Sequence, residues 1–232
     1  MLKKIESSSL GKNNLDWLKA SFHFSFGDYH NPERMGFGVL RVLNDDLIGG
    51  NKGFDTHPHR DMEIITYVIE GKLTHEDSMG NSGSIERGHV QYMSAGTGVY
   101  HSEYNNEDET IRSLQIWIIP DEKGHTPNYG DYKFPWELRK NKWLHMISSH
   151  RGDAPIKINQ DANFYVTELQ KGKETKFSVG PNRQAYLLQI EGITDINSIS
   201  LSTRDALEIV EEELVIKAKE TSHILVIEMA KP

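Results

Sequence analysis

Hydrophobic residues along the chain gather in short segments that polar turns separate. Four of these segments are rich in Ile, Val, Leu or Tyr: Met62 to Ile69, Ile111 to Ile119, Ala185 to Ile190 and His223 to Met229. Their short length and their β-branched residues favour strands over helices. Glycine-rich turns such as Met79 to Gly83 and Ala95 to Gly98 lie between segments of this kind. Many short strands with regular turns predict an all-β protein built as a sandwich or a barrel.

Two stretches depart from the strand pattern. The segment Asn14 to Ala20 places two leucines behind an asparagine that can cap a helix, and it is the one segment that we expect to be helical. The segment Pro120 to Arg139 contains two further prolines, Pro127 and Pro135, together with Gly130, so it predicts a linker between two parts of the chain.

A faint repeat supports a division into two parts. The segments Tyr67 to Gly71 and Leu188 to Gly192 both end a predicted strand with the pair Glu-Gly, and each is followed by a polar stretch and a further strand that carries a histidine. A pattern that occurs twice suggests a duplicated barrel. We therefore expect two domains, residues 1–125 and residues 126–232.

Composition and charge narrow the possible functions. The 34 acidic residues outnumber the 26 basic ones among 232, and the formal net charge of −8 argues against direct binding to nucleic acid. Cysteine is absent, so any metal site must use imidazole and carboxylate ligands. No apolar run approaches the roughly 18 residues of a membrane span, and none follows Lys3 and Lys4 as in a signal peptide. We expect a cytoplasmic protein that does not enter a membrane.

Two of the 11 histidines lie close together in one cluster, and a third lies beside a glutamate in another. The first cluster contains His57 and His59, and the second contains His101 and Glu103. Side chains two residues apart on a strand point to the same face, so each pair shares a face. Two such pairs on neighbouring strands would converge. Three imidazoles and one carboxylate suit a divalent transition metal and leave coordination positions open.

Two further residues compete for a place in this site. Glu63 lies four residues after His59, so strand parity also points it inward, and periodicity does not choose between Glu63 and Glu103 as the carboxylate ligand. His75 lies in a predicted hairpin. We favour a surface hydrogen-bonding role for His75 over a place in the site.

Several stretches of the sequence carry a family resemblance. They are Thr56 to Glu63 (THPHRDME), Met93 to Glu103 (MSAGTGVYHSE), Gly38 to Asp46 (GVLRVLNDD) and His75 to Gly80 (HEDSMG). At these residues the sequence resembles the cupins and, more narrowly, the pirin family, with most likeness to bacterial pirin-like quercetin 2,3-dioxygenases. The strong match spans about Phe37 to Ile119.

The resemblance implies a bicupin, in which the N-terminal barrel holds the metal and the C-terminal barrel lacks ligands. The implied ligands are His57, His59, His101 and Glu103, which leaves Glu63 to orient a ligand imidazole or Arg60. The C-terminal half departs from the metal pattern, because no His-x-His sequence follows His150 and His223 stands alone. Fe(II) suits a dioxygenase best, and Ni, Mn, Cu, Zn and Co are alternatives.

The resemblance also implies an activity. Pirin-like proteins of this type cleave quercetin with dioxygen and release carbon monoxide, and Glu103 would accept the substrate proton. Met93, Trp117 and Phe54 are candidates for the wall of a pocket for the flat substrate, although we favour a place in the core for each of them, because the interior of a barrel must be filled. The alternative function is a regulator that binds a protein partner and whose switch is the oxidation state of iron; a cupin isomerase or lyase is a third possibility. The resemblance favours a monomer.

Overall fold

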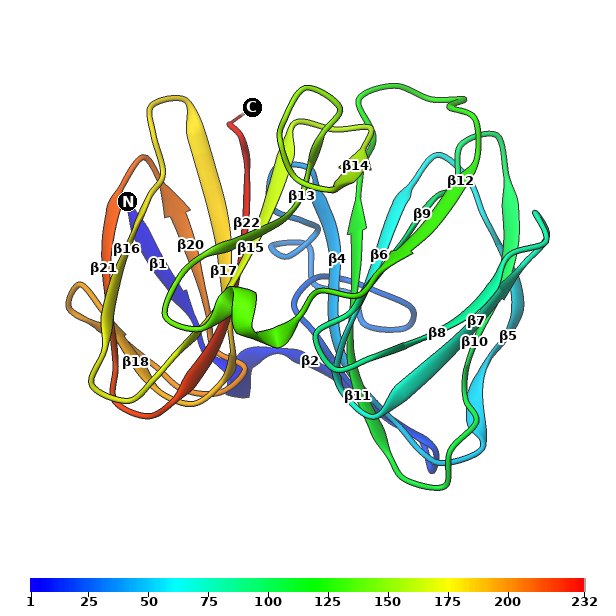
Figure 1. Cartoon of the computed structure of the whole chain (residues 1–232), viewed down its shortest axis with the longest axis horizontal. Helices are drawn as coiled ribbons and strands as arrows, with labels where there is room; N and C mark the ends of the chain where they lie inside the picture. Colours follow the sequence, from blue (N-terminus) through cyan, green and yellow to red (C-terminus); the bar gives the residue numbers. More distant parts are fainter. Residues whose placement is uncertain (232) are drawn as a thin grey trace. The chain divides into compact units, whose positions relative to one another are not determined.

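The computed structural model describes residues 1–231, which form two compact units made of strands (Figure 1). The N-terminal unit comprises Gly11–Pro135 with Ile158–Gln160. The C-terminal unit comprises Met1–Leu10, Trp136–Lys157 and the chain from Asp161 onward. The described residues contain no α-helix, only the two short 3-10 helices Ser7–Ser9 and Trp136–Arg139. The all-β prediction is confirmed.

The N-terminal unit consists of two antiparallel sheets. The larger sheet has the order β12 (Asn128–Tyr132), β9 (Val90–Ser94), β6 (Glu63–Glu70), β11 (Ile111–Ile118), β4 (Leu40–Ile48), β3 (Leu18–Phe22) and β2 (Gly11–Asn14). The smaller sheet has the order β5 (Lys52–His59), β10 (Val99–Asn105), β7 (Lys72–Asp77) and β8 (Ser82–Glu86). Leu73 and Ile85 of the smaller sheet pack with Ile48, Val68 and Ile111 of the larger one. The hydrophobic core therefore lies between the two sheets.

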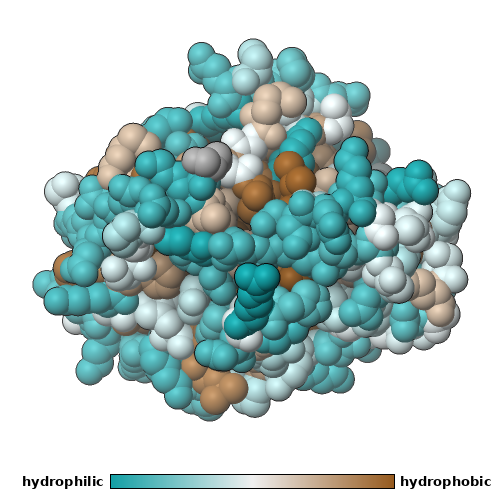
Figure 2. Space-filling model, turned by 90° about the horizontal axis from the view of Figure 1, so that it is seen from above, coloured by the Kyte–Doolittle hydropathy of each residue, from teal (hydrophilic) through white to brown (hydrophobic). Residues whose placement is uncertain are grey.

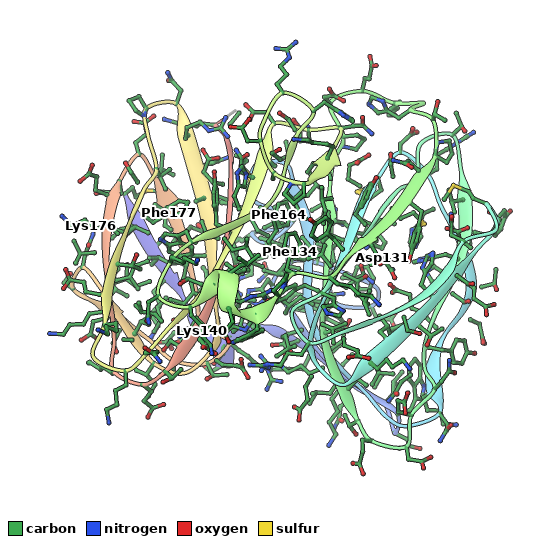
Figure 3. The ribbon with its side chains drawn as sticks, viewed as in Figure 1. Asp131, Phe134, Lys140, Phe164, Lys176 and Phe177 are labelled. Carbon is green, nitrogen blue, oxygen red and sulfur yellow. The ribbon has the colours of Figure 1, made fainter. Side chains whose placement is uncertain are left out.

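The C-terminal unit repeats this arrangement. Its larger sheet has the order β1 (Leu2–Ile5), β20 (Ala206–Val210), β17 (Arg183–Glu191), β22 (Ser222–Ala230), β15 (Ala162–Leu169), β13 (Leu144–Ser149) and β14 (Ile156–Ile158). Its smaller sheet has the order β16 (Glu174–Ser178), β21 (Glu213–Ala218), β18 (Thr194–Ile196) and β19 (Ile199–Leu201). Phe177, labelled in Figure 3, packs edge-on against Trp143 and Tyr165 beside the core between these sheets.

The two Glu-Gly pairs of the faint repeat occupy the same place in the two units. Gly71 follows β6 and Gly192 follows β17, and both strands belong to the larger sheets. Each glycine has a φ of 82°, a left-handed conformation that a side chain disfavours. The structure thus places the repeated sequence at an equivalent turn.

The segment Asn14–Ala20 forms a β-hairpin, so the helix prediction is wrong. β2 ends at Asn14, and β3 begins at Leu18. Leu18, Ala20 and Phe22 alternate along β3 and are all buried in the core of the N-terminal unit. The two-residue period of a strand therefore places the apolar side chains of this segment on one face, against the core.

The structure differs from the expected division at 125/126 in two places. The predicted linker Pro120–Arg139 contains β12, which pairs with β9 at the edge of the larger sheet of the N-terminal unit. The first strand of the chain, β1, pairs with β20 of the C-terminal unit, as the blue strand in Figure 1 shows. Backbone pairing between residues that are distant in the sequence determines to which unit β1 and β12 belong. Composition does not predict such pairing.

Within the described residues, no helix has the length and apolar character that crossing a membrane requires. Figure 2 shows a face on which hydrophilic residues predominate and hydrophobic residues occur in a few small groups.

Arg112 and Asp45 form a buried ion pair between β11 and β4. The Nε and Nη2 atoms of Arg112 donate to the two carboxylate oxygens of Asp45 at 2.9 and 2.6 Å. Because Asp45→Ala leaves Arg112 buried without this partner, we expect the free energy of unfolding to fall by about 3–5 kcal/mol in urea denaturation. Lys72→Ala, which removes the exposed pair of Lys72 with Glu107, should cost at most about 1 kcal/mol. Equal effects of the two substitutions would contradict the prediction.

Candidate metal centre

Two neighbouring strands of the smaller sheet, β5 and β10, carry the predicted metal ligands. In the antiparallel register, His57 lies opposite His101. The imidazole centroids of His57, His59 and His101 lie 4.5 to 4.8 Å apart. Their candidate ligand nitrogens all lie within 4.8 Å of one another. The structure therefore brings the three histidines together at a spacing that could hold one metal ion.

A β-bulge lies beside this cluster. One residue separates His101 from Glu103 on β10, whereas two residues separate their partners His57 and Phe54 on β5. A bulge changes the direction in which nearby side chains point. Glu103 lies opposite Phe54 and forms a second group of possible ligands with His75 and His101.

Glu103 is buried and accepts three hydrogen bonds. Its Oε1 accepts from the hydroxyl of Thr66 at 2.8 Å and from the amide of Gln91 at 2.9 Å, and its Oε2 accepts from the amide of Gln115 at 2.6 Å. Each carboxylate oxygen has two lone pairs, so one lone pair on Oε2 is left. Three donors hold the carboxylate in place and leave it able to bind a metal or to accept a proton.

His75 is fully buried in the site, and its surface assignment is wrong. Its ring stacks on Tyr129 with centroids 4.5 Å apart, and its Nε2 lies 3.1 Å from a carboxylate oxygen of Asp77. Its Nδ1 lies 3.2 Å from the amide of Gln91 and 3.4 Å from Nδ1 of His101. When Nε2–H of His75 donates to Asp77, Nδ1 of His75 is an acceptor. Nδ1–H of His101 can then donate to Nδ1 of His75, and this bond orients the ring of His101.

A signal in the sequence could have placed His75 in the site. His75 lies two residues after Leu73, which is fully buried in the core, so the two side chains share the inward face of β7. In the sheet, His75 then lies opposite Glu103. The two-residue spacing of His75 from the apolar Leu73 predicts the burial of His75 better than its place in a hairpin does.

The pKa of His59 and that of His101 are both lowered from 6.5 to about 3, and burial is the largest cause. The charges of neighbouring imidazoles contribute to the same shift, since each ring disfavours a second positive charge close by. Both rings are therefore neutral near pH 7, and their nitrogen lone pairs are available to a metal ion. The donor set fits a divalent transition metal.

A pocket of about 60 Å³ opens beside the cluster. Its wall contains the three histidines and Glu103 together with Phe26, Asn44, Asp46, Phe54, Gln115 and Trp117. The ring of Trp117 packs edge-on against His59 at 4.9 Å and against Phe26 at 5.4 Å. The candidate ligands thus face a small space bounded on one side by aromatic rings.

Two family models match the chain: Pirin over residues 4–118 and Quercetinase C-terminal cupin domain over residues 145–229. A pirin-like protein of Caulobacter vibrioides is 41% identical over 232 residues, which are 99% of this chain and 100% of that protein. The quercetin 2,3-dioxygenase of Escherichia coli strain K12 is 39% identical over 226 residues, 97% of this chain and 96% of that protein. The chain belongs to the pirin family.

A solved structure, the bacterial pirin YhhW from Escherichia coli in complex with nickel(II), has a TM-score of 0.94 to this pirin at 37% identity. The match covers 100% of both chains. The two units are therefore two cupin domains, and the bicupin fold expected from the sequence is confirmed.

Glu63 of this pirin does not orient a ligand imidazole or Arg60, so that expectation is wrong. Its buried carboxylate accepts from the hydroxyl of Ser94 at 2.7 Å, and from the backbone and side-chain amides of Asn159, each at 3.2 Å. Asp61, with a φ of 49°, interrupts the chain between β5 and β6. The parity counted from His59 therefore does not extend to Glu63.

Of the three candidate pocket residues, Phe54 and Trp117 line the space beside the histidines. Met93 instead packs in the core with Ile64 and Val99, which is the place that the sequence favoured for it. Nearness in sequence to a ligand strand does not tell which face of a strand a side chain occupies.

The C-terminal unit of this pirin contains one histidine at the place suggested by the repeat. Nδ1 of His223 lies 3.2 Å from a carboxylate oxygen of Glu191, and its ring packs against Trp136. Within residues 1–231, both groups of three possible metal ligands lie in the N-terminal unit.

His75→Phe tests whether His75 orients His101. The phenyl ring can still stack on Tyr129, but both ring nitrogens are lost. We expect the Kd for Ni(II), measured by calorimetric titration, to rise about 10- to 100-fold, as for other groups that orient a metal-binding imidazole.

Tyr129→Phe is the matched control for this experiment. It keeps the stacked ring and removes only a buried hydroxyl that has no hydrogen-bond partner, so the Kd for Ni(II) should not change. An unchanged nickel affinity in His75→Phe would mean that His101 keeps its orientation without His75.

Proposed function

We propose that this pirin is a metal-dependent dioxygenase that opens the central ring of flavonols such as quercetin with dioxygen and releases carbon monoxide. The observation that carries the proposal is the meeting of three imidazoles and a buried carboxylate in one aromatic-walled pocket. The name of the Escherichia coli relative, quercetin 2,3-dioxygenase, supports this activity.

The proposed ligands of one divalent metal are His57, His59, His101 and Glu103. Three nitrogens and one oxygen leave open positions in a five- or six-coordinate shell, which a substrate oxygen requires. We propose Fe(II), with Ni, Mn, Cu, Zn or Co as alternatives, and the nickel(II) in the YhhW structure supports a site of this kind. A bound metal would act as a Lewis acid that lowers the pKa of a substrate hydroxyl.

Glu103 is the proposed acceptor of the hydroxyl proton. The one lone pair left on Oε2 would serve the metal before substrate binds, and it can take the proton once this oxygen is released from the metal. The bonds to Thr66, Gln91 and Gln115 prevent rotation of the carboxylate in both states. A base in a fixed position lowers the barrier to proton transfer because little motion is needed before reaction.

The aromatic wall supports a flat substrate. Phe26, Phe54 and Trp117 line the pocket beside the histidines, and such side chains present apolar faces to a planar ring.

His101→Ala should abolish activity through loss of metal. We expect the purified variant to hold less metal by elemental analysis, and to release no carbon monoxide from quercetin in air. His150→Ala, which changes an exposed histidine of the C-terminal unit, should retain both the metal and turnover. Wild-type protein fully loaded with Fe, Ni, Mn or Cu that releases no carbon monoxide would contradict the dioxygenase and favour the regulator.

Glu103→Gln separates proton transfer from metal binding. The amide keeps the shape of the side chain but is a poor base, so we expect the turnover rate per bound metal to fall about 10²- to 10⁴-fold. Glu76→Gln, at an exposed position of β7, should leave this rate unchanged. Full turnover per metal in Glu103→Gln would exclude Glu103 as the proton acceptor.

A further inference from the structure

The pocket at the histidines adjoins a second, larger cavity of about 500 Å³ in the same unit. Four residues line both spaces: Phe26, Asn44, Asp46 and Phe54. The larger cavity, here called the aromatic chamber, is also lined by Trp17, Phe22 and Tyr29. A space of about 60 Å³ is far below the usual volume of a ligand site, whereas the chamber falls within that range.

The walls of the chamber suit a planar aromatic ligand. Trp17 and Phe54 pack edge to face at 5.4 Å, and Phe22 stacks on Tyr29 at 6.3 Å. The ring packing holds these walls in fixed positions. A ligand that reaches the histidines with one oxygen would place the rest of its ring system here.

Asp46 is a buried carboxyl group at the junction of the two spaces. It lies on β4 opposite Ala20 of β3 and Ser113 of β11, and 5% of its surface is exposed. Its Oδ1 has no hydrogen-bond partner. Lys12, the cation in the chamber wall, donates to the hydroxyl of Ser21 instead. A buried polar group without a partner is unusual, because its lost hydration is not replaced.

Asn44 repeats this feature two residues earlier on the same face of β4. It is 2% exposed, lines both spaces, and its Oδ1 also has no hydrogen-bond partner. Two unpartnered acceptor oxygens side by side at one junction indicate a place for a ligand group that donates hydrogen bonds.

Burial and the neighbouring negative charges favour the neutral form of Asp46. Burial raises the pKa of its carboxyl group well above the usual value, and the negative charges of Asp45 and Glu103 raise this pKa further. A neutral carboxyl can both donate and accept a hydrogen bond, which matches a hydroxyl group.

We propose that Asp46 and Asn44 are specificity-determining residues that bind a hydroxyl substituent of a planar aromatic ligand lying in the aromatic chamber. The inference rests on the proposed function, since the same ligand is held at the histidines by another oxygen. It predicts that the site prefers polyhydroxylated aromatics over analogues that lack the additional hydroxyl groups.

Binding without turnover tests this proposal. The nickel-loaded protein is titrated without oxygen with quercetin and with 3-hydroxyflavone, which lacks the other ring hydroxyls of quercetin. Quenching of tryptophan fluorescence reports binding, because Trp17 and Trp117 line the two spaces. We expect the wild-type chain to bind quercetin about tenfold more tightly, the equivalent of about one hydrogen bond.

Two variants at position 46 distinguish recognition from structure. Asp46→Leu, of similar size, should weaken the binding of quercetin and bring the ratio of the two affinities close to one. Asp46→Asn keeps a donor and an acceptor and should restore most of the ratio. Nickel affinity and circular dichroism should be unchanged in both variants, which excludes a folding defect.

The outcomes separate this inference from the dioxygenase proposal. Equal affinity ratios in the wild-type chain and folded Asp46→Leu would overturn the role of Asp46, whatever the turnover. A ratio that depends on Asp46 in a chain that never releases carbon monoxide would support recognition of the hydroxyl and contradict the dioxygenase.

Discussion

The pairing of β5 with β10 is the constraint on which the candidate metal centre depends. Side chains alternate between the two faces of a strand, so a slip of one residue in this pair would turn His57 and His59 away from His101. The bulge beside the cluster helps to fix the register, because its extra residue can fit at only one point of the ladder. The neighbour on the other side of β10 is β7, which sets His75 opposite Glu103. Both neighbours of a single strand therefore build the site.

Polar contacts at the site join the two sheets of the N-terminal unit. Glu103 belongs to the smaller sheet, whereas its three donors, Thr66, Gln91 and Gln115, belong to β6, β9 and β11 of the larger sheet. A carboxylate buried between sheets would be costly if its oxygens were unpaired, and these bonds offset that cost. Because the donors lie on three strands of the larger sheet, the position of the carboxylate depends on how the two sheets pack together. The hydrogen bonds that join the two sheets here are therefore the same ones that hold Glu103 in the candidate site.

Much of the fold and the ligand histidines could be predicted from the sequence, because both depend on a period of two. Alternation along a strand is enough to pair His57 with His59, and short β-branched segments are enough to indicate sheets. The failures occur where alternation is interrupted or where partners lie far away in the sequence. Asp61 interrupts the alternation of side chains between His59 and Glu63. The segment after Asn14, whose residues are typical of a helix start, is instead the turn of a hairpin. The pairing of β1 with β20 joins the two ends of the chain, which no local pattern records.

The contact between Glu63 and Asn159 limits how the gene segment for the N-terminal unit can be recombined with other genes. Every candidate ligand is encoded before residue 136, yet two of the three hydrogen bonds to the buried Glu63 come from a three-residue loop encoded later, Ile158–Gln160. A gene fragment that ends at Pro135 would carry all the candidate ligands and lack the two amides of Asn159 that donate to this carboxylate. The barrel with the candidate ligands therefore depends on a segment that is encoded after them. Recombination that exchanged the C-terminal half would have to preserve this loop, or replace Glu63 with it.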